Sequence, residues 1–147
     1  MDRIDRELLG LLVRNGRSSL QDLAEGIRLS PSATRERVRG LESAGFVTGY
    51  GAVVNETLLG FGVEAVVEID LAPGADESAF SQTLTGTPAV VEALHATGEH
   101  DYLLRLRCRD TDELHQVVRS LKSRHGATRT LTRVVLGETV IRRPRLP

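Results

Sequence analysis

Cysteine and long apolar runs are scarce or missing in this 147-residue sequence, and each of these absences excludes a class of protein. With Cys108 as its only cysteine, the chain can form neither an internal disulfide nor a zinc site built from several thiolates. No segment approaches the roughly 18 uncharged apolar residues needed to span a bilayer. The amino-terminal MDRIDRELLGLL mixes acidic and basic residues and has no small-residue cleavage site, unlike a secretory signal. The sequence therefore predicts a soluble, cytoplasmic protein with no membrane partner.

Charge is nearly balanced over the whole chain, with a net value of −1, but it is unevenly distributed. Residues 1–50 carry a net charge of +1, residues 51–127 carry −6 and residues 128–147 carry +4. Two neutral or basic ends around an acidic middle indicate different tasks along the chain.

Three short amphipathic helices are predicted within residues 1–50. Their starts are marked by Asp2, by Ser19 in a capping-box pattern, and by Ser30 followed by Pro31. Side chains suited to burial recur behind these starts at helical spacing, namely Ile4, Leu8, Leu11 and Leu12, then Leu20, Leu23, Ala24 and Ile27, then Thr34, Val38 and Leu41. A three-residue turn at 28–30 joins the second and third helices, which is typical of a helix-turn-helix unit.

The third predicted helix, from Pro31 to the residue before Gly45, carries polar side chains opposite its buried stripe. Arginine pairs with the edge of guanine, glutamate accepts from the amino group of cytosine, and serine reaches phosphate or base. Free N–H groups at the start of the helix add a phosphate site. The candidate DNA-binding residues are Ser30, Ser32, Ala33, Arg35, Glu36 and Arg39. The alternative interpretation of the same residues is a solvated helical face in a three-helix packing unit.

The first third of the chain resembles the amino-terminal half of the Lrp/AsnC transcription regulators. The resemblance lies in DRIDRELLGLLVRNGR and in LQDLAEGIRLSPSATRERVRGLESAGFVTGY. One position departs from the family, because relatives usually place glycine in the turn where this chain has Arg28, and Gly26 lies two residues earlier. If the turn needs a left-handed residue, Arg28 costs on the order of 1 kcal/mol there.

The periodicity of the sequence changes after the third helix. FVTGYGAVV, residues 46–54, predicts a strand that leads away from the helices, with glycines that permit a bend. From residue 62 onward the pattern has the order β-α-β-β-α-β, with strands predicted at 63–71, 89–97, 102–108 and 128–136. This order is the ferredoxin-like arrangement, an antiparallel sheet with both helices on one face.

We therefore predict an α+β fold with two domains. A winged helix-turn-helix DNA-binding domain occupies residues 1–50, a linker strand and hinge occupy 51–62, and a ferredoxin-like dimerisation and effector-binding domain occupies 63–147. One face of the predicted sheet has no covering layer, and Val66, Leu94, Ala96 and Leu103 are expected on it among charges. An uncovered apolar face is a self-association surface, and a two-fold dimer that pairs sheet with sheet covers it.

The middle of the chain, including TPAVVEALHATGEHDYLLRL, resembles the ligand-sensing domain of the Lrp/AsnC regulators. This resemblance implies homodimers that assemble further to octamers. It also implies that the turn GEHDY lines an effector site between dimers, where an amino acid binds through its α-amino and α-carboxylate groups. The candidate effector-binding residues are Gly98, His100, Asp101, Tyr102, Thr130 and Thr132. The alternative for Asp101 is that it simply caps a β-turn.

No metal site and no cofactor are predicted. The four histidines, His95, His100, His115 and His125, do not follow any common metal-ligand spacing. Cys108 follows the alternation of its strand and is expected to be a small core side chain.

The leading hypothesis is a transcription regulator rather than an enzyme. Helix 31–44 would bind double-stranded DNA sequence-specifically, and a small molecule, an amino acid, would shift the assembly between states of different DNA affinity. A first alternative is a siroheme decarboxylase-like enzyme on the same scaffold, with His95, His100, Arg105 and Arg107 around a tetrapyrrole. A second is a nucleoid-architectural protein, distinguished by a low ratio of specific to non-specific DNA affinity.

Overall fold

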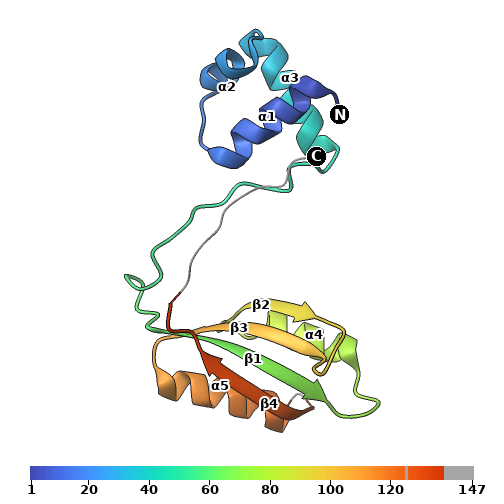
Figure 1. The fold of residues 1–147 in the computed structure, drawn as a ribbon, viewed down its shortest axis with the longest axis vertical. Coiled ribbons are helices and arrows are strands. Elements are labelled where there is room, and N and C mark those ends of the chain that lie inside the picture. Colours follow the sequence, from blue (N-terminus) through green and yellow to red (C-terminus); the bar gives the residue numbers. More distant parts are fainter. Residues whose placement is uncertain (125, 138–147) are drawn as a thin grey trace. The chain divides into compact units, whose positions relative to one another are not determined.

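The computed structural model describes residues 1–124 and 126–137, and Figure 1 shows how its helices and strands follow one another. Those residues divide into two compact units, with the boundary between Val53 and Val54. His125, and residues 138–147 of the domain predicted at 63–147, lie outside the described residues. Within the described ranges, every helix is too short or too polar to cross a bilayer.

The first unit is a three-helix bundle whose helices begin where the sequence predicts. The helices are α1 (Arg3–Arg14), α2 (Leu20–Ile27) and α3 (Pro31–Ser43). Asp2 and Asp5 form a reciprocal capping box at the start of α1, and Ser19 does the same for α2. Ser30 caps α3 by accepting the N–H of Ala33, directly before Pro31.

The predicted buried stripes of the three helices meet in one core. Its buried members are Leu8, Leu9, Leu12, Leu23, Ile27 and Leu41. Thr34 is also fully buried, and its hydroxyl donates to the Ser30 carbonyl at 2.9 Å, so its polar atom has a partner. Gly26 lies close to α1, because a Cβ at that position would approach Leu11 Cδ1 to 2.7 Å, so the Leu11 side chain would have to shift. Glycine at this position therefore allows α1 and α2 to come close together.

The turn between α2 and α3 contains a left-handed residue that is not glycine. Arg28 ends α2 with φ 57° and ψ 45°, and within the described residues it is the one non-glycine with positive φ. Its N–H still bonds to carbonyls of the helix, those of Ala24 and Glu25. The turn therefore keeps its normal hydrogen bonds and its position. Having arginine instead of glycine at position 28 places backbone strain on Arg28 and does not shift the turn.

The strand predicted at residues 46–54, and with it the wing of the first domain, is not formed. A strand needs a neighbouring backbone with which to exchange hydrogen bonds, and residues 48–54 make no backbone hydrogen bond within the described chain. Their apolar side chains are exposed, with Val53 72% accessible. β-prone composition therefore gave the wrong prediction here, because the described residues offer this segment no partner strand.

Both ends of the linker are nevertheless fixed by side chains. On the helical unit, Tyr50 donates its hydroxyl to Glu42 Oε1 at 3.0 Å, and its ring lies against Gly16. On the sheet unit, Glu56 pairs with Arg107. Residues 51–55 lie between these two attachment points.

The second unit has the predicted β-α-β-β-α-β order. Its elements are β1 (Val63–Leu71), α4 (Glu77–Thr85), β2 (Val90–His95), β3 (Tyr102–Cys108), α5 (Thr111–Arg124) and β4 (Ala127–Val134). The strands form one antiparallel sheet in the order β2-β3-β1-β4 (Figure 1). β2 is shorter than predicted because the chain turns after His95, where the Ala96 N–H bonds to the Asp101 carbonyl.

One face of this sheet carries the core and the other is open. Ala65, Val67 and Ile69 of β1 are fully buried beneath both helices, in one cluster with Phe80 of α4 and Leu121 of α5. The alternate residues of β1 and β3 face the other way. Cys108 is fully buried in the same core, as predicted, and burial raises the pKa of its thiol.

Replacing Arg28 by glycine should stabilise the helical unit. Glycine adopts the left-handed conformation without the Cβ clash, so we expect the free energy of unfolding to rise by about 0.5–1 kcal/mol. Urea unfolding followed by circular dichroism measures it. Arg6→Gly, within α1 and exposed, is the matched control and should lower the same quantity by about 1 kcal/mol. An unchanged or lowered stability of Arg28→Gly would show that the turn is not strained.

Candidate functional site

The exposed face of α3 holds charged side chains that contact no partner in the part of the chain that the structure describes. Arg35, Glu36 and Arg39 are exposed, and none of them makes a hydrogen bond or ion pair within residues 1–124 and 126–137. The opposite side of the helix is anchored in the core through Thr34 and Leu41. The helix therefore presents free donors and one free acceptor to solvent while its back is fixed.

The start of α3 adds a second set of donors. Ser30 and Ser32 lie with their hydroxyls 3.1 Å apart, and both residues are exposed. Ala33, also predicted at the site, is half-buried and its N–H is used by the Ser30 cap at 3.3 Å. Hydroxyls beside the positive end of a helix suit a phosphate. The six residues predicted to bind DNA thus lie along one helix and its cap.

Arg37 belongs to the same helix but has a different environment. Its Nη1 donates to Asp2 Oδ2 at 2.7 Å and to Asp5 Oδ1 at 2.6 Å. The hydrogen bond that Arg37 donates to Asp2 raises the pKa of Arg37, while the pKa of the Asp2 carboxyl is lowered first by the Asp5 N–H and then by Arg37. Sequence reasoning missed this cluster, because nothing in local spacing links the amino terminus to the middle of α3.

Asp101 in the GEHDY turn has a structural role that the sequence left open. Its Oδ2 accepts the N–H of Leu71 at 2.7 Å, and its own N–H donates to the Ile69 carbonyl at 3.0 Å. Gly98, with φ 136°, supplies the backbone conformation that closes the turn. The carboxylate therefore ties the turn to the end of β1, and its second oxygen makes none of the hydrogen bonds found among the described residues.

His100 lies between two carboxylates of β1 on the open face of the sheet. Its Nδ1 is 2.6 Å from Asp70 Oδ1, and its Nε2 is 3.0 Å from Glu68 Oε2. All three side chains are largely screened from solvent, and His100 is 15% exposed. Glu68 also pairs with Arg133 of β4. The acidic alternation of β1 was the sequence signal for this cluster, although it did not identify the histidine as the partner.

The remaining predicted effector residues face the helices instead. Tyr102 is 3% exposed, and its hydroxyl lies 2.9 Å from the Ser81 hydroxyl of α4. Thr130 and Thr132 lie opposite Ile69 and Val67, and so share the helix-facing side of the sheet. One copy of the chain therefore brings together Gly98, His100 and Asp101, and places the two threonines on the other side of the sheet.

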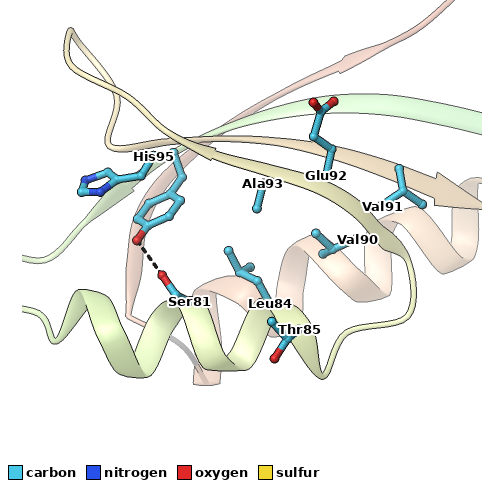
Figure 2. A pocket seen from close by; sticks show the side chains of 9 residues that line it. Ser81, Leu84, Thr85, Val90, Val91, Glu92, Ala93 and His95 are labelled. Carbon is cyan, nitrogen blue, oxygen red and sulfur yellow. Dashed lines mark hydrogen bonds between the residues drawn. The ribbon is translucent and has the colours of Figure 1, made fainter. Parts of the chain in front are cut away.

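A pocket lies between α4 and the edge strand β2, as Figure 2 shows. Its volume is about 350 Å³. Its lining includes Leu84, Val90 and Ala93. At the end nearest the GEHDY turn, the His95 ring stacks on Tyr102 with centroids 4.7 Å apart. The pocket thus joins an apolar wall to the base of the predicted effector turn. Its volume falls in the range of small-ligand sites.

The charges on the open face of the sheet are paired within the chain. Arg105 pairs with Glu64 and Glu92, and Arg107 pairs with Glu64 and Glu56. Among these pairs stands an apolar row in which Leu94, Leu103 and Leu131 occupy neighbouring strands on either side of Glu68. Val66 shares this face, as predicted, while Ala96 lies beyond the end of β2.

The tetrapyrrole alternative is not supported by this arrangement. Arg105, Arg107 and His100 are held by carboxylates, and His95 lies on the other side of the sheet. Within residues 1–124 and 126–137, no three His, Cys, Asp or Glu side chains are grouped in a way that would hold a metal ion.

Comparison with known proteins gives matches over both units. Residues 1–42 match the AsnC-type helix-turn-helix domain, and residues 64–146 match the Lrp/AsnC ligand binding domain. The leucine-responsive regulatory protein of Escherichia coli K12 is 35% identical over 141 residues, which cover 94% of this chain and 86% of that protein.

Two solved structures resemble the whole chain. A transcriptional regulator from Neisseria meningitidis in complex with L-methionine is 31% identical, with a TM-score of 0.90 over 96% of this chain and 93% of that one. A feast or famine regulatory protein from Mycobacterium tuberculosis, also complexed with L-methionine, is 30% identical, with a TM-score of 0.92 over 99% of each chain.

Proposed function

This chain belongs to the Lrp/AsnC family of DNA-binding transcriptional regulators, and on that premise we propose that it reads a specific DNA sequence under the control of an amino acid. The members of this family are regulators and not enzymes, so the siroheme decarboxylase alternative is not retained. The observation that carries the proposal is the face of α3, where Arg35, Glu36 and Arg39 are exposed and have no partner among the described residues.

DNA reading is assigned to this face by the chemistry of its side chains. Arg35 and Arg39 offer paired donors that fit the O6 and N7 atoms of guanine in the major groove, and Glu36 can accept from cytosine N4. Ser30 and Ser32 lie at the start of the helix, where hydroxyls and the helix dipole favour a phosphate. Phosphate contacts would fix the register of the helix, and the arginines would supply the discrimination.

The effector site is assigned to the GEHDY turn together with Thr130 and Thr132. Since one copy separates the turn from the threonines, the site requires contributions from more than one copy. The free oxygen of Asp101 is suited to an α-ammonium group. Relatives are named for leucine or solved with L-methionine, and the apolar pocket beside Tyr102 supports a side chain of that kind.

The open face of the sheet is assigned to a two-fold homodimer, which assembles further to an octamer. Burying a charge without a partner is costly, but here each arginine of the face is already paired. The apolar row Leu94, Leu103 and Leu131 would gain cover from the same row of a second copy. A dimer also brings two α3 helices to one duplex, as half-site recognition requires.

Arg39→Ala should weaken binding to a selected duplex by about 1–3 kcal/mol and relax the preference at one base pair. The duplex is one that the wild-type chain selects from a random-sequence library, and fluorescence anisotropy at fixed salt measures both specific and non-specific affinity. Equal losses on all duplexes would make Arg39 a phosphate contact instead. A wild-type ratio of specific to non-specific affinity near one would favour the architectural alternative.

L-Leucine or L-methionine should raise the melting temperature of the chain, by about 5–10 °C at a concentration of roughly 100 Kd. Asp101→Asn should abolish that shift, because it removes the charge while its amide oxygen can still accept the Leu71 N–H. Glu99→Gln, an exposed change in the same turn, is the matched control and should keep the shift. The effector proposal fails if none of the twenty amino acids stabilises the wild-type chain.

A further inference from the structure

Two carboxylates at the start of α1 are shared between their own helix and a side chain of α3. Asp2 uses Oδ1 to accept the Asp5 N–H at 2.8 Å, and Asp5 uses Oδ2 to accept the Asp2 N–H at 3.0 Å. The other oxygen of each accepts from Arg37 Nη1, at 2.7 Å and 2.6 Å. All four carboxylate oxygens are therefore used, and these three residues form what we call the α1–α3 clamp.

The clamp is partly screened from solvent, mainly on the side of Asp5. The side chain of Asp5 is 19% exposed and that of Arg37 is 31% exposed, whereas Asp2 is 52% exposed. Partly buried charge pairs are screened less by water and salt than exposed ones. The two bonds to one guanidinium nitrogen also restrict its position from two directions, and the capping box holds both acceptors in place.

The apolar contacts of α3 do not fix its rotation in the same way. Leu41 and Val38 hold the helix against the core, but the hydrophobic effect that buries them is itself non-directional. Hydrogen bonds to Arg37 are directional. Since residues two positions apart differ by about 160° around a helix, Arg35 and Arg39 both point away from the side that holds Arg37.

We propose that Arg37 is a positioning residue for DNA recognition: through Asp2 and Asp5 it sets the rotation of α3 and so aims Arg35 and Arg39 at the bases. This inference rests on the proposed DNA-reading function of α3. Base contacts need side chains held to fractions of an ångström, whereas attraction to phosphates is long-range and tolerates error. Loss of the clamp therefore lowers sequence discrimination more than it lowers non-specific affinity.

The test compares four variants of the full chain, at a temperature where all are folded, on the selected duplex and on an unrelated duplex of equal length. Arg37→Met keeps the apolar stem and removes the charge, and we expect the ratio of specific to non-specific affinity to fall about three- to tenfold. Asp5→Asn should lower it comparably, since it removes the charge from the other side. Arg37→Lys should keep most of the ratio, because one ammonium can replace Nη1. Arg3→Met, an exposed change on α1, should leave it unchanged.

Each other result has a definite meaning. If Arg37→Met and Asp5→Asn keep the wild-type ratio and only lower the melting temperature, the clamp stabilises the unit and positions nothing. If Arg37→Met weakens both duplexes equally and Asp5→Asn does not, Arg37 contacts phosphate directly and the inference is overturned. A wild-type ratio of specific to non-specific affinity near one would rule out the proposed function. It would rule out the role of Arg37 as well, because α3 would then make no base contacts that could be positioned.

Discussion

Helix α3 is packed on one side only, and its opposite side carries charged groups that no side chain in the described part of the protein neutralises. Thr34 and Leu41 are buried beneath it, while Arg35, Glu36 and Arg39 are left in water. A free arginine can exchange its hydration for a base edge, whereas one already bonded to a carboxylate would first have to give up that bond. The reading function depends on this asymmetry between a fixed back and an unpaired front.

On the open face of the sheet, by contrast, the arginines are paired with carboxylates of the same chain. This difference between the two surfaces explains how one chain can bind two kinds of partner. There, Arg105, Arg107 and Arg133 are bonded to carboxylates of the same chain. Such a surface has little attraction for a polyanion and can be covered by another protein surface without leaving a lone buried charge. The unpaired helix is suited to DNA, and the internally paired sheet is suited to a second copy.

Local chemistry made most of the fold predictable, and long-range contacts were the part that sequence could not supply. Helix caps and strand alternation depend only on residues close in sequence, as at Asp2, Ser19 and Ser30 and in β1 and β3. The ends of the helices and strands were therefore predicted within a few positions. The strand expected at 46–54 failed because pairing depends on a distant partner. The same reason hid the α1–α3 clamp and the place of His100 between Glu68 and Asp70.

Methylation interference on the selected duplex tests most directly whether α3 reads bases in the major groove. N7 of guanine is exposed in that groove and N3 of adenine lies in the minor groove, so methylating each atom probes one groove. The account predicts that methylation of particular guanines at N7 blocks binding of the wild-type chain, and that Arg35→Ala no longer senses one of them. Binding that is indifferent to N7 methylation, or blocked only by methylation at adenine N3, would contradict it.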